Sequence, residues 1–324
     1  MGFTILVTGP KIASKAKEML EENNFKIVYV PAYSSSELLE DIAKKEQIDA
    51  LLVRMGEITR DVLSASSKLK VVAKHGIGVN NIDIDAVTEL NIPVFIALNG
   101  NYQSVAEHAV ALIYGLTKKI VRLDRRLRKG NWDKGGYKGV ELNKKSLGLI
   151  GLGRIARRVI ELIRPLNMDI IGYDPYISKD EFPHEVKVTK NLVELLSCSD
   201  YISIHCPLTE ETRNLIDEEE FKKMKNEAFI INTARGAIIN EISLIKALKQ
   251  GWIAGAGLDT FSMEPPQKDN PLWGMSNVIV TPHIGGITEE SFNRMGIESV
   301  QHILSIINNE KVVLSACVNP QVLK

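Results

Sequence analysis

Four short polar segments carry the side chains with which this chain could do chemistry. Each follows an apolar run that predicts a buried strand, and the segments are HCPLT at 205–209, NTARG at 232–236, LDTFSMEPP at 258–266 and TPHIGG at 281–286. From them we single out a histidine, a carboxylate and an arginine, namely His283, Glu264 and Arg235. Reduction of a ketone by hydride needs a proton donor whose pKa lies near the working pH, and histidine suits that role.

The two charged residues complete this interpretation. A carboxylate beside a histidine orients the ring and favours its charged form, which is the role we give to Glu264. A guanidinium can bind a substrate carboxylate through two parallel hydrogen bonds and polarise the carbonyl, which is the role we give to Arg235. A structural histidine and a structural ion pair remain the alternative. His108 is interpreted as structural and His302 as a surface residue.

The elements that would position these residues begin with a glycine-rich segment. An apolar run at 147–150 predicts a buried strand, which leads into Gly151-Leu-Gly153-Arg-Ile-Ala156 and a helix. This is the G-x-G-x-x-A dinucleotide pattern. Gly151 allows the tight turn, Gly153 lets the backbone approach a pyrophosphate, and Ala156 lets the helix pack close to the strand. A structural glycine turn is the alternative.

Asp174 strengthens the dinucleotide interpretation. It ends a second predicted strand, at 169–173, about 20 residues beyond the glycines. A carboxylate there can bind both ribose hydroxyls of NAD and repels the 2′-phosphate of NADP. The segment therefore predicts NAD as the cofactor.

Strand and helix patterns alternate along the chain and predict parallel sheets covered by helices. Strands are expected at 3–8, 26–30, 49–53, 71–74, 93–96, 147–150, 169–173, 186–188, 201–204, 229–232, 254–258 and 278–280. Helices are expected at 36–45, 60–64, 84–90, 192–196, 217–224, 242–250 and 289–309, and one long helix through 105–127. The last helix can return the chain to its first part. We therefore expect a discontinuous domain at 1–99 and 285–324, and an inserted cofactor domain at 100–284.

Two loops of the first domain could meet a substrate. Arg54 follows one predicted strand, and the segment from Lys74 through His75, Gly76, Ile77, Gly78 and Val79 follows another. The two glycines can turn backbone N–H groups towards an anion, as a nest does, or form a plain turn. Arg54 and Lys74 could bind a distal phosphate or be ordinary surface charges.

Composition excludes several classes of function. Forty basic and forty acidic residues among 324 give zero net charge, so nothing favours nucleic acid or an anionic membrane as a partner. The three cysteines lack metal-ligand spacing and suit a reducing cytoplasm, and we expect no metal. The start lacks signal-peptide features, and no apolar run is long enough to cross a membrane.

The chain resembles the D-isomer-specific 2-hydroxyacid dehydrogenases over essentially its whole length. The matching segments are GIGVNNID at 76–83, SVAEH at 104–108, LIGLGR at 149–154, HCPLT at 205–209, NTARG at 232–236, Asp259 with Glu264-Pro265, and PHIGG at 282–286. The family implies an α/β fold with two doubly wound parallel sheets, in which a Rossmann NAD-binding domain is inserted into a flavodoxin-like substrate domain.

The resemblance also implies roles for individual residues. Arg235, Glu264 and His283 match the catalytic positions, and Asp259 is expected near the nicotinamide carboxamide. Gly76 to Val79 match the carboxylate nest, and His75 stands where many members have a small residue. The expected cofactor-binding residues are Gly151, Gly153, Arg154, Ile155, Asp174, His205, Cys206, Pro207, Thr212, Thr233, Ala234, Arg235, Asp259, His283, Gly285 and Gly286.

Within the family, the chain looks most like short 3-phosphoglycerate dehydrogenases, which implies a cytoplasmic enzyme of serine biosynthesis. Because the chain ends soon after its last predicted helix, we expect no serine-binding regulatory domain. A glyoxylate or hydroxypyruvate reductase, a D-lactate-type enzyme and a co-repressor-like NAD sensor are the alternatives. A glycine-rich loop at 130–142, with Trp132 and Tyr137, suggests a contact with a partner subunit and hence a homodimer.

Overall fold

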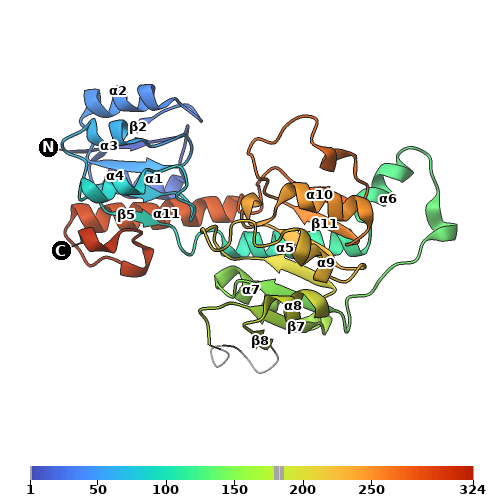
Figure 1. Ribbon diagram of the computed structural model, residues 1–324. Helices are drawn as coiled ribbons and strands as arrows, with labels where there is room; N and C mark the ends of the chain where they lie inside the picture. The colour runs from blue at the N-terminus through green and yellow to red at the C-terminus, as the bar shows by residue number, and fades with distance from the viewer. Residues whose placement is uncertain (1, 179–181, 183–185, 324) are drawn as a thin grey trace. The chain divides into compact units, whose positions relative to one another are not determined.

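The computed structural model describes residues 2–178, 182 and 186–323. The chain divides into two compact units, Met1–Asn101 with Ile287–Lys324 (unit 1) and Tyr102–Gly286 (unit 2) (Figure 1). The sequence placed the crossings after residues 99 and 284, whereas the structure places them after residues 101 and 286. Each unit is built on its own parallel sheet.

Unit 1 contains a five-stranded parallel sheet of order β2-β1-β3-β4-β5. This order is that of flavodoxin-like folds. The strands are β1 (Phe3–Val7), β2 (Phe25–Tyr29), β3 (Ala50–Val53), β4 (Val71–Lys74) and β5 (Val94–Ile96). Every residue of β3 and β4 is buried, because helices cover both faces of the sheet.

The helices of unit 1 pack on opposite faces of this sheet. Ile5 and Val7 belong to one core cluster with α1 and α11, whereas Leu6 points into the other with α2, α3 and α4. Successive side chains of a strand point to opposite faces, so one strand feeds both cores. The helices are α1 (Ser14–Glu22), α2 (Ser36–Glu46), α3 (Arg60–Ser64), α4 (Ile84–Glu89) and α11 (Glu289–Ile307).

One interpretation from the sequence is wrong in this unit. His302 on α11 is 5% exposed, and its ring stacks on Phe95 of β5 at 5.0 Å between centroids. Since α11 lies against the sheet, the side of the helix that carries His302 is inside the fold.

Unit 2 contains a seven-stranded parallel sheet of order β12-β11-β10-β9-β6-β7-β8. The strand order reverses between β6 and β9, which is the switch point where ligands bind in Rossmann folds. The strands are β6 (Ser146–Ile150), β7 (Asp169–Tyr173), β8 (Val186–Thr189), β9 (Tyr201–Ile204), β10 (Phe229–Asn232), β11 (Gly255–Leu258) and β12 (Val278–Val280). The two doubly wound α/β sheets confirm the expected fold class.

The helices of unit 2 also cover both faces. One core cluster contains α5 and α7, and the other contains α8, α9 and α10. The helices of this unit are α5 (Tyr102–Thr117), α6 (Ile120–Leu127), α7 (Arg154–Ile163), α8 (Leu192–Cys198), α9 (Glu218–Lys223) and α10 (Glu241–Gln250). The short 3-10 turns of unit 2 are Asp133–Gly136, Arg164–Leu166, Gly236–Ile238 and Pro271–Gly274, and those of unit 1 are Leu314–Ala316 and Pro320–Val322.

The single long helix expected through 105–127 is wrong. The chain breaks between α5 and α6, where Lys119 adopts a left-handed φ of 53°. The Nζ of Lys118 donates to the carbonyl of Val140 at 2.6 Å, and the hydroxyl of Tyr137 donates to the carbonyl of Lys118 at 3.2 Å. These contacts with a later segment hold the break in place.

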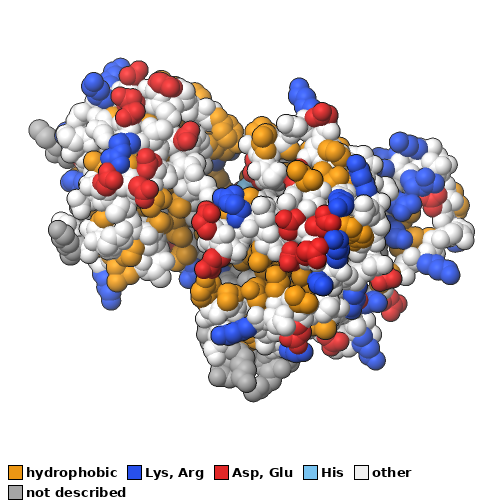
Figure 2. Space-filling view, viewed as in Figure 1, with side chains coloured by type: hydrophobic (Ala, Val, Ile, Leu, Met, Phe, Trp, Pro, Cys, Tyr) orange, Lys and Arg blue, Asp and Glu red, His pale blue; other side chains and the backbone are white. Residues whose placement is uncertain are grey.

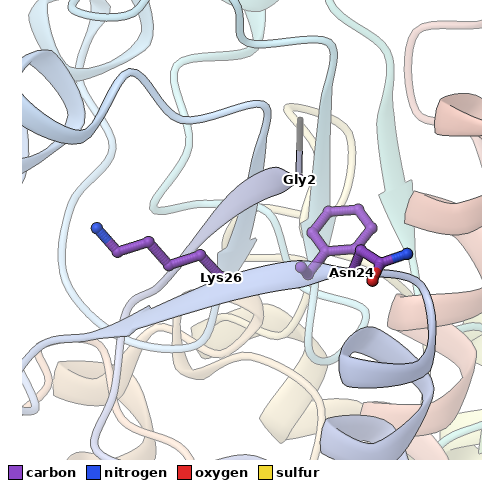
Figure 3. Close-up of a pocket in the computed structure, with 4 residues that line it drawn as sticks. Gly2, Asn24 and Lys26 are labelled. Carbon is purple, nitrogen blue, oxygen red and sulfur yellow. The ribbon is translucent and has the colours of Figure 1, made fainter.

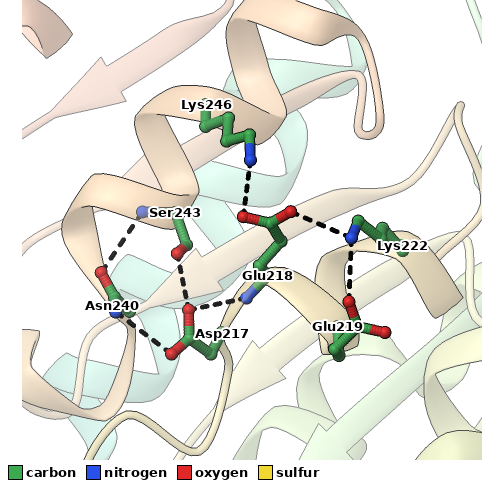
Figure 4. Close-up of polar contacts among 7 residues, drawn as sticks. All are labelled: Asp217, Glu218, Glu219, Lys222, Asn240, Ser243 and Lys246. Carbon is green, nitrogen blue, oxygen red and sulfur yellow. Dashed lines mark hydrogen bonds and ion pairs between the residues drawn. The ribbon is translucent and has the colours of Figure 1, made fainter.

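A polar junction joins α9 to α10 (Figure 4). The carboxylate of Asp217 accepts hydrogen bonds from the Glu218 backbone N–H at 2.7 Å, the Ser243 hydroxyl at 2.5 Å and the Asn240 amide at 3.1 Å. Asp217 is the N-cap of α9, so one side chain caps the start of a helix and ties that helix to its neighbour.

Two further observations apply only to the described part of the chain. No helix there is long and apolar enough to cross a membrane. No group of three or more His, Cys, Asp or Glu side chains in those residues is arranged to hold a metal ion.

Candidate active site

The glycine-rich turn after β6 has the geometry of a dinucleotide cradle. Gly151 has φ 86°, and a Cβ there would lie 2.6 Å from the backbone nitrogen of Cys206. A Cβ at Gly153 would meet no protein atom within 4 Å, so packing does not require glycine there. A bare backbone at the start of α7 leaves room for a phosphate at the helix N-terminus. Ala156 is fully buried against the core, as close packing of helix and strand requires.

Asp174 stands beside this turn. Its Oδ2 accepts the backbone N–H of Leu152 at 3.0 Å, and its Oδ1 accepts that of Tyr176 at 3.0 Å. The carboxylate is thus fixed next to the glycine-rich turn at 151–156, called the fingerprint below, where sequence reasoning placed it. Arg154 and Ile155 occupy the first turn of α7.

The loop after β9 closes one side of the turn. The backbone N–H of His205 donates to the carbonyl of Ile150 at 2.7 Å, and Thr212 Oγ1 donates to the carbonyl of Pro207 at 2.6 Å. Burial lowers the pKa of His205 to about 3, so its ring is neutral. Burial likewise raises the pKa of the Cys206 thiol to about 11, which makes it a poor nucleophile.

Two buried polar atoms near the switch point fit a polar ligand. The Oγ1 of Thr233 and the Nδ1 of His205 have no hydrogen-bond partner among the described residues. Such atoms are costly to bury, so an acceptor or donor supplied by a bound molecule would satisfy them. Ala234 follows Thr233, and its carbonyl accepts a hydrogen bond from Arg235.

His283 and Glu264 form a direct pair. The Nδ1 of His283 lies 2.6 Å from Oε2 of Glu264, and Oε1 of Glu264 accepts the backbone N–H of Phe261 at 3.1 Å. Because Nδ1 is engaged by the carboxylate, Nε2 is the nitrogen that remains for proton exchange with a substrate. Two segments far apart in sequence, after β11 and after β12, meet here.

Arg235 lies at the end of β10 and contributes charge to this pair. Burial lowers the pKa of its guanidinium, and the charge of Glu264 acts against that change. Burial alone would raise the pKa of Glu264, but the hydrogen bonds from His283 and the Phe261 backbone, with the charge of Arg235, lower it. Glu264 is therefore an anion in contact with the His283 ring.

Asp259 has a role that sequence reasoning did not describe. It is 1% exposed, and its carboxylate accepts the Thr281 hydroxyl at 2.6 Å and the backbone N–H groups of Ile284 at 2.9 Å and Gly285 at 2.7 Å. The sequence suggested a cofactor contact for Asp259, and the structure adds an anchor for the segment after His283, which runs through Gly285 to Gly286. Thr281 and His108 were missed as its partners, since no local pattern links them.

The predicted substrate residues of unit 1 lie together within that unit. Lys74 Nζ donates to Asn81 Oδ1 at 2.7 Å and to the carbonyl of Arg54 at 3.4 Å. The Arg54 guanidinium lies 4.9 Å from the ring centre of Phe292, and its buried Nε has no partner among the described residues. His75 is 9% exposed and also packs on Phe292.

One glycine of the proposed nest has a conformation that favours glycine. Gly76 has φ 146°, which residues with a side chain rarely adopt. Ile77, Gly78 and Val79 are half-buried.

Two hollows lie at opposite ends of the strands in the unit 1 sheet. One of about 430 Å³, at the carboxyl ends of the strands, is lined by Tyr33, Arg54, Met55, Gly56, Glu57, Lys74, Asn80 and Asn81. The other, of about 580 Å³, lies around the start of β2 and is lined by Gly2, Asn24, Phe25 and Lys26 (Figure 3). Ligands of open parallel sheets bind at the carboxyl edge, so we assign no role to the second.

Comparison with known proteins places this geometry in a family. The family model "D-isomer specific 2-hydroxyacid dehydrogenase, NAD binding domain" matches residues 110–285. A D-3-phosphoglycerate dehydrogenase of Methanocaldococcus jannaschii is 41% identical over 308 residues, which are 94% of this chain and 58% of that protein. The chain spans between half and three-fifths of the length of the phosphoglycerate dehydrogenases that it matches at 41% and 36% identity.

Two further relatives match along most of their length. A hydroxypyruvate reductase of Thermotoga maritima is 40% identical over 260 residues, which are 79% of this chain and 84% of that protein. The NAD-complexed structure of a D-isomer specific 2-hydroxyacid dehydrogenase from Lactobacillus delbrueckii ssp. bulgaricus superposes with a TM-score of 0.80 at 26% identity. That superposition covers 98% of this chain and 99% of the other.

Proposed function

The chain belongs to the D-isomer specific 2-hydroxyacid dehydrogenases, and we propose that it transfers hydride between NAD(H) and a D-2-hydroxy acid or its 2-oxo acid. The observation that carries this proposal is the His283–Glu264 pair at 2.6 Å, with Arg235 acting on the same carboxylate. A proton donor, its anionic partner and a carboxylate-binding cation are the groups that the reaction needs.

In the proposed reduction, Arg235 binds the substrate carboxylate and polarises the neighbouring carbonyl. The nicotinamide, when bound, supplies the hydride to the carbonyl carbon. His283 gives the proton on Nε2 to the carbonyl oxygen, and Glu264 stabilises the ring while it is charged. In the reverse direction, His283 Nε2 takes the proton from the substrate hydroxyl.

We expect NAD rather than NADP as the cofactor because of Asp174. A carboxylate held against the fingerprint by the Leu152 and Tyr176 N–H groups repels a 2′-phosphate. Asp174→Asn should reduce the preference for NADH over NADPH, measured as the ratio of the two kcat/KM values. An unchanged ratio would exclude this role for Asp174.

For the substrate, we propose D-3-phosphoglycerate and 3-phosphohydroxypyruvate. Arg54 and Lys74 support a phosphate group, since both line the hollow at the carboxyl ends of the unit 1 strands and the buried Nε of Arg54 has no acceptor within the described part of the chain. Reduction of hydroxypyruvate is the second candidate, because the T. maritima relative of that name matches along most of its length.

A panel of 2-oxo acids with NADH tests both candidates. We expect the highest kcat/KM with 3-phosphohydroxypyruvate, and lower values with hydroxypyruvate, glyoxylate and pyruvate. Arg54→Gln should lower kcat/KM about tenfold for the phosphorylated acid, as the loss of one charge-assisted hydrogen bond predicts, and leave hydroxypyruvate unaffected. Lys26→Gln, at the other edge of the sheet, is the matched control. A preference for hydroxypyruvate would make the second candidate the function.

His283→Ala tests the reaction itself. It should remove turnover with every acid in the panel. NADH should still bind, as followed by the change in fluorescence on its addition, because the fingerprint is untouched. Normal turnover by this variant would refute the assignment. Binding of NADH without turnover in the wild-type chain would favour the role of an NAD-sensing binding protein.

We further propose that the chain forms a homodimer through residues 120–140. No residue of α6 is buried, and apolar side chains of this segment are exposed, with Ile120 54%, Leu127 56% and Trp132 76% exposed. Figure 2 shows Lys and Arg side chains around the same part of unit 2. An exposed apolar set of this kind is typical of an interface. Leu127→Ser with Trp132→Ala should lower the mass seen by light scattering to that of one chain, and Ile242→Ser is the exposed control.

A further inference from the structure

Behind His283, three side chains of unit 2 form a continuous hydrogen-bonded chain. His108 on α5 has its Nε2 2.9 Å from the Oγ1 of Thr281, and this hydroxyl lies 2.6 Å from Oδ1 of Asp259. The same carboxylate accepts the two backbone N–H groups that follow His283. Helix α5 is thereby connected to the backbone that carries the proposed acid/base.

The direction of these hydrogen bonds follows from the groups themselves. A carboxylate only accepts, so the single hydroxyl proton of Thr281 points to Asp259. The lone pairs of Thr281 Oγ1 then face His108, whose Nε2 must carry the hydrogen and donate it. The tautomer of His108 is therefore set by Asp259 through Thr281. His108 Nε2 also lies 3.6 Å from Oδ1 of Asp259, and the His108 side chain is 20% exposed.

His283 needs this support because of its backbone. Its φ is 53°, in the left-handed region that a residue with a side chain enters only when its surroundings hold it there. The next turn is tightly fitted, since a Cβ at Gly285 would lie 2.9 Å from Oδ2 of Asp259 and 3.2 Å from Cδ2 of His108. His108 is thus linked to this turn through Thr281 and Asp259, and the glycine at 285 leaves no room for a side chain beside its ring.

We propose that His108 is a positioning residue for His283, acting through Thr281 and Asp259. By donating to Thr281 it keeps the Thr281 hydroxyl donating to Asp259, and Asp259 then holds the peptide groups after His283 in the strained turn. This keeps the imidazole of His283 against Glu264 and aims Nε2 at the substrate. The inference rests on the proposed function of His283 and assigns His108 no contact with substrate or cofactor.

Kinetics of three single variants and one double variant test this chain of hydrogen bonds. His108→Leu removes the donor and should lower kcat by about tenfold to a hundredfold, the cost of a slightly misplaced catalytic group, while the Kd for NADH stays unchanged. His108→Gln keeps an N–H donor and should restore most of kcat. Thr281→Val removes the next group in this series of hydrogen bonds. Adding His108→Leu to Thr281→Val should therefore lower kcat no further.

The control lies on the same helix. Thr117→Val removes a buried hydroxyl from α5 that bonds to the carbonyl of Ile113 and to Tyr201, and it should leave kcat unchanged. Three results would each overturn the proposal: wild-type kcat in His108→Leu, a His108→Gln variant as slow as His108→Leu, or costs of His108→Leu and Thr281→Val that add.

Hydrogen exchange separates this inference from the proposed function. If the wild-type protein turned over no 2-oxo acid, the proposed function would be refuted, but the structural role of the hydrogen bonds from His108 through Thr281 to Asp259 would not. In that case the chain is judged by the amides of Ile284 and Gly285, which should exchange faster in His108→Leu and at the wild-type rate in His108→Gln and Thr117→Val. Equal exchange rates in His108→Leu and wild type would refute the positioning role of His108, whatever the activity.

Discussion

The burial of His75 predicts how unit 1 responds to acid. The ring lies at the end of β4 and packs on Phe292 of α11 with 5.0 Å between ring centres. Burial, then the positive charge of Arg54, lowers the pKa of His75 from 6.5 to about 4. The folded unit therefore holds a neutral imidazole under conditions in which the unfolded chain would bind a proton.

The sign and size of the effect follow from linkage. As pH falls below 6.5, the unfolded chain takes up the proton first, so the free energy of unfolding of unit 1 falls until pH reaches about 4. The gap between the two pKa values corresponds to about 3 kcal/mol in total, of which about 2 kcal/mol is lost between about pH 7 and about pH 5. Above about pH 7 this contribution to stability is fully present.

Hydrogen exchange of the β4 amides measures this loss within unit 1, after correction for the pH dependence of intrinsic exchange. His75→Gln keeps a neutral polar side chain that cannot titrate, so its β4 amides should lose about 2 kcal/mol less protection over that pH range than those of the wild type. The amides of β10 in unit 2 are the internal control. Burial lowers the pKa of His205 in unit 2 to about 3, so these amides should also lose protection in acid, by the same amount in both proteins. Equal losses at β4 in wild type and variant would refute the reasoning.

Three further experiments test the packing of unit 2. Gly151→Ala should lower the free energy of unfolding by about 2 kcal/mol or more and abolish NADH binding, because the new Cβ meets the Cys206 backbone at 2.6 Å. Gly130→Ala, with φ 79° but nothing within 4 Å, should cost only about 1 kcal/mol in the same denaturant titration, and equal costs would exclude the clash. Asp217→Ala should cost about 1 to 2 kcal/mol through the lost cap and the lost tie to α10, whereas Glu219→Ala, in an exposed ion pair, should change stability little. Iodoacetamide near pH 8 should alkylate exposed Cys198 well before Cys206, whose pKa burial raises to about 11, as mass spectrometry of the peptides would show; faster labelling of Cys206 would contradict its burial.

The sequence by itself determined the features that depend on local spacing. The placement of Gly151, Gly153 and Asp174 beside one turn could be predicted because a strand, a tight turn and a helix follow one another within about 25 residues. The meeting of Arg235, Glu264 and His283 was also predictable. Each follows a strand, and the carboxyl ends of parallel strands share one edge of a sheet. The alternating pattern likewise predicted both doubly wound sheets.

Features that arise from contacts between distant segments escaped sequence reasoning. The apolar repeat through 105–127 continues across Lys118, and only the contacts of Lys118 with Val140 and Tyr137 show where the helix breaks. His302 has the polarity of a surface residue, yet the packing of α11 against β5 buries it.

Asp259 shows the same limit within the candidate site. Its place after β11 predicted that it would reach the cofactor edge, but its partners are separated from it by long stretches of chain. Thr281 and Gly285 come from the segment after β12, and His108 comes from α5. Spacing in the sequence decided which residues can do chemistry. Only the tertiary structure decided which side chains hold His283 in a turn that its own backbone disfavours.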